Sequence, residues 1–232
     1  MNKFLRLIAF FTLLLPTFLI SAEEEEHVPV GTRPKYSDLV SFSEREIPLF
    51  VTETEEQTTC GFIFDRYPPI YYPPSYHSLR SVSAFGDSLE LEDGSVWKLP
   101  SPDGKAALYW EANVPIAITQ NTSWFSRKYK YRLIYNPQSQ NPISIDANLH
   151  FGPYKNGEYT LYAADFNHPS KRMVLSDFSQ WEIYSWDSSK FSEWQPNDVI
   201  IIGFNSCGFF DSNYEALLIN VTTDDYIRAR QY

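Results

Sequence analysis

Residues with reactive or metal-binding side chains are scarce in this chain. It has 232 residues but only two cysteines and four histidines. The histidines, His27, His77, His150 and His168, are scattered, and none has a spacing typical of a metal site. The Gly-x-Ser-x-Gly, P-loop and dinucleotide-binding motifs are also absent. We therefore expect no metal, no cofactor and no catalytic set.

Basic residues are also few. The chain has 19 Lys and Arg against 29 Asp and Glu, which gives a formal net charge of -10. No stripe of basic residues with interleaved aromatics occurs in it. A surface with this excess of acidic residues repels phosphate backbones. We therefore expect no nucleic-acid partner.

Long hydrophobic runs are lacking, apart from one near the N-terminus. Leu7–Ile20 is apolar, follows Lys3 and Arg6, contains Pro16 and ends before Ala22 and a run of glutamates. A membrane-spanning helix needs about 20 apolar residues, so an uncleaved anchor is the less favoured alternative. We interpret residues 1–22 as a cleaved secretory signal peptide. The protein is then exported to the periplasm, cell envelope or exterior, with no stable transmembrane span.

Aromatic residues, in contrast, are abundant. They make up 17% of the chain, and this content favours β-structure, since aromatic rings fit a pleated, half-buried surface. We interpret residues 23–81 as an acidic leader followed by an extended Pro/Tyr-rich segment, in which Tyr71 and Tyr72 separate two Pro-Pro pairs. This segment is either a recognition strip for a partner or a stiff connector.

An internal repeat organises the rest of the chain. The stretch Leu89–Leu99 recurs further along, and an ungapped comparison in the register that places Trp97 on Trp181 gives 15 identities over 58 positions. Unrelated sequences would give about three or four. The repeated residues include four tryptophans, two aspartates and two asparagines: Trp97 and Trp181, Trp110 and Trp194, Asp93 and Asp177, Asn136 and Asn220. We interpret the tryptophans as core anchors rather than a ligand platform, and the Asp and Asn residues as turn formers.

Each repeat predicts about five short strands. We expect an all-β chain of two tandem, duplicated small β-barrels of SH3-like or OB-like type, over residues 82–150 and 173–232, joined by a linker or hairpin over 151–172. Asp93-Gly94 between apolar runs predicts a hairpin turn. Because the junction is short, the modules should pack together or share a strand.

Function should lie where the copies differ. Trp124, Tyr184 and Trp186 have no aromatic counterpart in the other copy, so together with Tyr71 and Tyr72 they are the candidate binding residues. We predict an exported, non-enzymatic protein that acts in binding or in envelope or surface interaction, with a protein or glycan partner.

The alternative is a secreted hydrolase. Cys207 could act as its nucleophile with His150, or a carboxylate pair such as Asp177 and Asp187 could cleave glycosides. A disulfide between Cys60 and Cys207 would exclude Cys207 as the nucleophile. Two separate thiols are equally compatible with the sequence.

Overall fold

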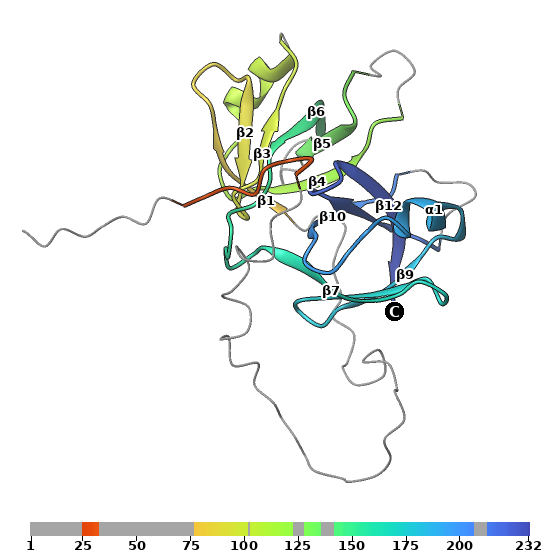
Figure 1. Cartoon of the computed structure of the whole chain (residues 1–232). Helices are drawn as coiled ribbons and strands as arrows, with labels where there is room; N and C mark the ends of the chain where they lie inside the picture. The colour runs from red at the N-terminus through yellow and green to blue at the C-terminus, as the bar shows by residue number, and fades with distance from the viewer. Residues whose placement is uncertain (1–24, 33–76, 102, 123–127, 136–141, 207–212) are drawn as a thin grey trace, which may run out of the picture.

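Strands dominate the computed structural model, shown in Figure 1. It describes residues 25–32, 77–101, 103–122, 128–135, 142–206 and 213–232. The expected signal peptide and several candidate residues lie outside this part of the chain: Cys60, Tyr71, Tyr72, Trp124, Asn136 and Cys207. Among the helices that the structure describes, none is long and apolar enough to cross a membrane. The prediction of a mostly β fold is confirmed.

The first six strands form a closed barrel. They are β1 (His77–Val82), β2 (Ser88–Leu91), β3 (Val96–Lys98), β4 (Pro115–Gln120), β5 (Tyr131–Tyr135) and β6 (Ile143–Phe151). Their spatial order is β1-β2-β3-β6-β5-β4, and the antiparallel pairing of β1 with β4 closes the ring. The 3₁₀-helix η3 (Asp103–Tyr109) connects β3 to β4. β3 lies beside β6 rather than β4, which is a Greek-key arrangement.

The other six strands pair in the same order. They are β7 (Leu161–Asn167), β8 (Arg172–Leu175), β9 (Gln180–Ile183), β10 (Val199–Phe204), β11 (Ala216–Asn220) and β12 (Asp225–Gln231), with the short helices η4 (Ser185–Asp187) and α1 (Ser188–Phe191) after β9. The order is β7-β8-β9-β12-β11-β10, and β7 also pairs with β10. Strand n of the first set therefore corresponds to strand n+6 of the second. The register that aligns Trp97 with Trp181 also aligns the first residue of β1 with that of β7, and the first residue of β4 with that of β10.

Each set has six strands where the sequence indicated about five. The added strand is β1 in the first set and β7 in the second. β1 extends into the range, residues 23–81, that we assigned to the leader, and β7 lies within the expected linker or hairpin, residues 151–172. The sequence of β1, HSLRSV, has only two apolar residues, Leu79 and Val82, and they are three positions apart, so it lacks the apolar–polar alternation that marks a strand. The pairing of β1 with β4 holds this segment as a strand, which its local sequence does not predict.

The repeated stretch forms one hydrogen-bonded turn in both copies. In the first, the Ser95 amide donates to Asp93 Oδ1 (2.8 Å), and the buried indole of Trp97 donates to Ser95 Oγ (2.9 Å). The second copy makes the same bonds, from the Ser179 amide to Asp177 Oδ1 (3.0 Å) and from Trp181 Nε1 to Ser179 Oγ (2.8 Å). The shared Asp, Ser and Trp therefore form one unit that closes the hairpin and satisfies the indole N–H in the core.

Two hydrophobic clusters meet at strands β10 and β11. Even-numbered residues of these strands, such as Ile200 and Leu218, belong to the core of the second set. Odd-numbered residues, such as Ile201 and Leu217, belong to the cluster that contains the core of the first set. Both strands are thus buried on both faces, which explains their continuous apolar runs. A single parallel pairing, Phe204 with Thr119, joins β10 to β4.

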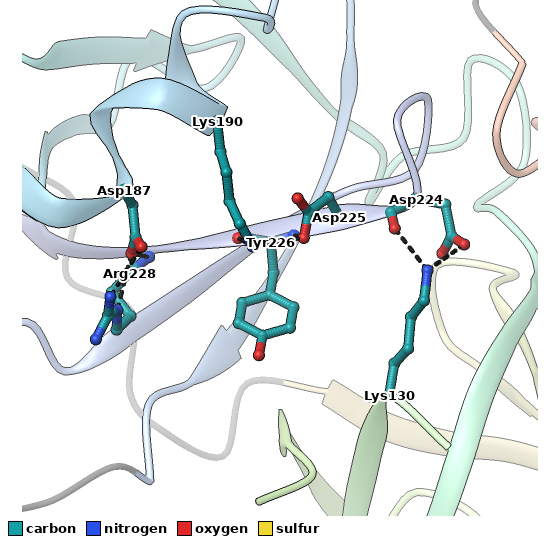
Figure 2. A network of polar contacts seen from close by, with 7 residues as sticks. All are labelled: Lys130, Asp187, Lys190, Asp224, Asp225, Tyr226 and Arg228. Atoms are coloured by element: carbon teal, nitrogen blue, oxygen red, sulfur yellow. Dashed lines mark hydrogen bonds and ion pairs between the residues drawn. The ribbon is translucent and has the colours of Figure 1, made fainter. Parts of the chain in front are cut away.

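A short N-terminal segment and an ion pair also join the two sets. Residues 25–32, red in Figure 1, lie against both. The Val28 amide donates to Pro153 O (2.9 Å), and the Gly31 amide donates to Val221 O (2.9 Å). Lys130, just before β5, pairs with Asp224 in the turn before β12, at the right of Figure 2. The two sets therefore pack as neighbours rather than being joined by the connecting chain alone.

Candidate functional site

The four repeated tryptophans lie inside the protein. Their exposed fractions are 0% for Trp97, 1% for Trp181, 2% for Trp194 and 7% for Trp110. Trp97 meets Tyr131 edge to face, with ring centroids 5.4 Å apart, and Trp110 stacks on Tyr135 at 4.7 Å. Buried rings of this kind stabilise the core and cannot contact a ligand.

Trp186 has the opposite environment, since 82% of its surface is exposed. It belongs to η4, directly after β9. Its ring centroid lies 6.0 Å from that of Tyr184, and Tyr184 lies 5.0 Å from Tyr214. The structure therefore brings together two of the predicted binding residues, Tyr184 and Trp186, and adds Tyr214.

Arginines stack on these tyrosines across the outer side of β8, β9 and β12. The guanidinium carbon of Arg228 lies 4.4 Å from the ring centroid of Tyr184, and that of Arg230 lies 5.4 Å from Tyr214. Arg172 stacks on Tyr232 in the same way, at 4.0 Å. We name this surface the tyrosine–arginine face and define it by Arg172, Glu182, Tyr184, Trp186, Tyr214, Arg228, Arg230 and Tyr232.

The alternation of strand residues explains why these side chains share a face. Arg172, Glu182 and Arg230 stand side by side on three paired strands, because Glu182 is in register with both arginines. Their odd-numbered neighbours, such as Met173 and Ile183, are buried in the core. Sequence reasoning missed all three arginines. Two of them, Arg228 and Arg230, are two residues apart on β12, so their side chains lie on one face of the sheet, and this spacing was a usable signal.

Carboxylates hold two of the three arginines. Arg230 Nη2 lies 2.7 Å from Glu182 Oε2. Asp187 accepts from the Arg228 side chain at Nε and Nη2, both at 2.8 Å, and from the Arg228 amide at 2.9 Å, as Figure 2 shows. Arg172, which stacks on the Tyr232 ring, has no carboxylate partner among the described residues.

The Tyr214 hydroxyl of this face stays protonated at neutral pH. Partial burial and the neighbouring Glu182 raise the pKa of Tyr214, and the Tyr214 hydroxyl lies 3.3 Å from Glu182 Oε1. The hydrogen bond to Glu182 raises the pKa of Arg230, which keeps its full charge. The face thus presents aromatic rings, phenol donors and guanidinium groups, a set that suits stacking and orienting hydrogen bonds to a polar ligand.

Comparisons of the chain with protein-family models, curated proteins and solved structures found no match.

A polar cleft of about 1010 Å³ lies elsewhere on the molecule, beside residues 25 and 26 and the loop 154–159. Its lining includes five acidic and two basic side chains: Glu25, Glu26, Glu92, Asp93 and Glu158, with Arg80 and Lys155. Tyr154 also lines it and donates to Glu90 Oε1 (2.6 Å), and burial together with Glu90 raises the pKa of Tyr154 to about 12. This cleft favours cations, but Glu25 and Glu26 pair with Arg80 and Lys155 of its own lining, and Glu92 pairs with His77.

Three residues considered for hydrolysis, Asp177, Asp187 and His150, lie in the described part of the chain and have structural partners, whereas Cys207 lies outside it. Asp177 accepts from Ser179 in the hairpin turn, and Asp187 is bound to Arg228. His150 is exposed, with its ring 4.3 Å from that of Phe151. Asn220 accepts from the amides of residues 222 and 223 and forms the turn before β12. Within the described part of the chain no group of three or more His, Cys, Asp or Glu residues could hold a metal ion.

Proposed function

We propose that this chain is an exported, non-enzymatic binding protein, built from two duplicated small β-barrel modules, and that the tyrosine–arginine face of the second module contacts the ligand. Export rests on the signal-peptide pattern of residues 1–22. Duplication is supported by the common register of the two strand sets and by the common hydrogen bonds of the two hairpin turns. We take six strands, rather than five, as the size of each module.

The observation that carries the proposal is the exposure of Trp186 beside Tyr184. Because 82% of the Trp186 surface is exposed, its side chain does not stabilise the hydrophobic core. Exposed apolar side chains that cluster, rimmed by polar residues, typically mark interaction sites. Tryptophan and tyrosine are also the side chains most enriched among residues that dominate binding energy.

The tyrosine–arginine face is specific to the second module. In the register of the repeat, Arg172 corresponds to Ser88, and Arg230 corresponds to Asp146. Tyr184 and Trp186 correspond to prolines, at positions 100 and 102. What the two copies share serves the fold, and what they do not share forms this face. This distribution favours a binding role for the second module and a supporting role for the first.

A binding screen tests the proposal. The secreted chain without residues 1–22 is applied to a glycan array and used to capture partners from the host envelope, together with Trp186→Ala and a matched control, Tyr109→Ala, which removes an equally exposed aromatic from the first module. We expect a ligand that the wild type and the control retain and Trp186→Ala loses. Turnover of a ligand without retained binding would contradict the non-enzymatic proposal.

A further inference from the structure

We propose that the tyrosine–arginine face binds a carboxylated polysaccharide, a glycan chain with uronic-acid units. This inference rests on the proposed function, and it adds the chemical class of the ligand. Its starting point is the charge of the face, which carries three arginines and one glutamate, with Asp187 behind Arg228. The chain as a whole has ten more acidic than basic residues. The face thus reverses the sign of the molecule, so it attracts an anion locally.

The guanidinium group of Arg172 is the anchor for a carboxylate. It stacks on Tyr232 and has no carboxylate partner among the described residues. A guanidinium group presents a planar fork of N–H donors, which matches a carboxylate with two parallel hydrogen bonds. Arg230 stands two strands away, with Glu182 between them, and its side chain is 42% exposed although one edge is bound to Glu182. The face therefore offers two separated cationic groups rather than one dense patch.

The aromatic rings supply the part of the site that recognises a sugar. Trp186 and Tyr184 lie next to one another at the end of β9, at a tilt of 36° between the ring planes. Such rings stack on the apolar faces of successive pyranose units, while the tyrosine hydroxyls and arginine donors reach the ring substituents. In a uronic-acid polymer each sugar ring has an apolar face and one carboxylate. Such a polymer fits the aromatic rings and the guanidinium groups of the tyrosine–arginine face.

An acidic peptide fits the face less well. One way for an extended peptide to gain affinity is to add a strand to an open sheet edge, which gives it main-chain hydrogen bonds. β9 lies between β8 and β12, and β12 lies between β9 and β11, so neither offers an edge. A nucleic acid is disfavoured because duplex DNA carries about one negative charge per 1.7 Å of its axis, and Glu182 and Asp187 interrupt the cations that would have to meet so dense a row of phosphates.

Polygalacturonate and its methyl-esterified form test the inference, because the two polymers share one sugar and differ in the methyl group that removes the carboxylate charge. Binding is measured by titration calorimetry and by tryptophan fluorescence of the chain without residues 1–22. We expect the ester to bind at least about tenfold more weakly than the acid form. Affinity for the acid form should also fall in about 1 M salt, where the Debye length is about 3 Å.

Variants separate the charge from the stacking. Arg172→Ala should weaken binding of the acid form by about tenfold and leave binding of the ester unchanged. Arg172→Lys, which keeps the charge but loses the fork, should lie between, and it serves as a second probe if the alanine variant unfolds. Trp186→Ala should weaken both forms by about 30-fold. Lys105→Ala, an exposed cation of the first module, should change neither.

Each other outcome has a defined meaning. Equal binding of the acid and the ester overturns the carboxylate inference but leaves the proposed aromatic binding face intact. Binding of polyglutamate without binding of polygalacturonate overturns it in favour of an acidic peptide. Absence of binding to all three polymers overturns it, while the envelope capture described above still decides whether the face binds any partner.

Discussion

The ring of Tyr154 occupies the space in which a side chain at Gly94 would lie. A Cβ atom at residue 94 would overlap Cδ2 and Cε2 of Tyr154, and Gly94 has a φ of 85°. The equivalent residue in the second copy is Phe178, with a φ of 67°. The hairpin turn thus accepts a side chain at positive φ, and the contact with Tyr154 is what requires glycine in the first copy.

Gly94→Ala should therefore lower the free energy of unfolding by about 3 kcal/mol, from steric overlap plus the strained backbone. In a Tyr154→Ala background the same change should cost only about 1 kcal/mol, because only the backbone strain is left. Urea unfolding of the four proteins gives the coupling between the two sites. Equal costs in the two backgrounds would show that the ring does not limit residue 94.

The two hairpin serines should have equal importance. Ser95→Ala removes the acceptor of the buried Trp97 indole N–H, and Ser179→Ala does the same to Trp181. An unsatisfied buried donor costs about 1–3 kcal/mol, so each variant should lose that amount of stability. Ser101→Ala, at an exposed position, is the control. A large loss in only one copy would argue against equivalent turns.

Two tryptophans of the second copy should differ sharply in their effect on stability. Trp194→Ala empties a position that is 2% exposed and should cost about 3–5 kcal/mol. Trp186→Ala changes a surface residue and should shift the free energy of unfolding by less than about 0.5 kcal/mol. Thermal melts of both variants test this contrast. A large loss for Trp186→Ala would assign that residue to the fold instead of to a binding face.

A buried histidine should make stability depend on pH. His77 Nδ1 lies 2.7 Å from Glu92 Oε1, and Nε2 lies 2.9 Å from Ile202 O in β10 of the second set. Burial lowers the pKa of His77, but the hydrogen bond and charge of Glu92 outweigh it, so the net pKa is raised above its ordinary 6.5. Burial raises the pKa of Glu92, but His77 outweighs it, so that pKa is lowered from 4.5.

Folding thus favours the charged forms of both partners. The contribution of His77 is complete below pH 6.5 and is lost as the pH rises through its raised folded pKa. The contribution of Glu92 is present above pH 4.5 and is lost as the pH falls through its lowered folded pKa. The pair should therefore stabilise the protein most between these two values. Burial raises the pKa of Asp93, so this residue adds an opposing loss of stability as the pH rises through its raised folded pKa.

Urea unfolding of wild type and His77→Gln between about pH 4 and pH 9 checks this dependence. The stability difference between them should shrink as the pH rises above 6.5. His150→Gln, which changes an exposed histidine, should track the wild type. A difference that is constant across this range would show that His77 does not titrate with folding.

The candidate site could be predicted only in part. Tyr184 and Trp186 stand out because the other copy has no aromatic counterpart to them. Arg172, Tyr214 and Arg230 could not be grouped with them, since they come from three separate segments that meet only when β8, β9, β11 and β12 are paired. The contribution of Trp124, Tyr71 and Tyr72 stays a prediction, because they lie outside the described residues.

The sequence by itself determined the β class, the internal repeat and the hairpin at Asp93-Gly94. The β class follows from the aromatic content, and the hairpin follows from turn residues that act over a few positions. Only the tertiary structure decided that β1 closes the first barrel and that β7 pairs with β10, since each pairs with a strand that is distant in the chain: His77 with Ile116, and Leu161 with Ile200. It also decided which tryptophans are buried. Trp181 and Trp186 are close in the sequence, yet Trp181 lies on β9 and fills the core, whereas Trp186 lies on the short helix η4 after that strand and faces solvent.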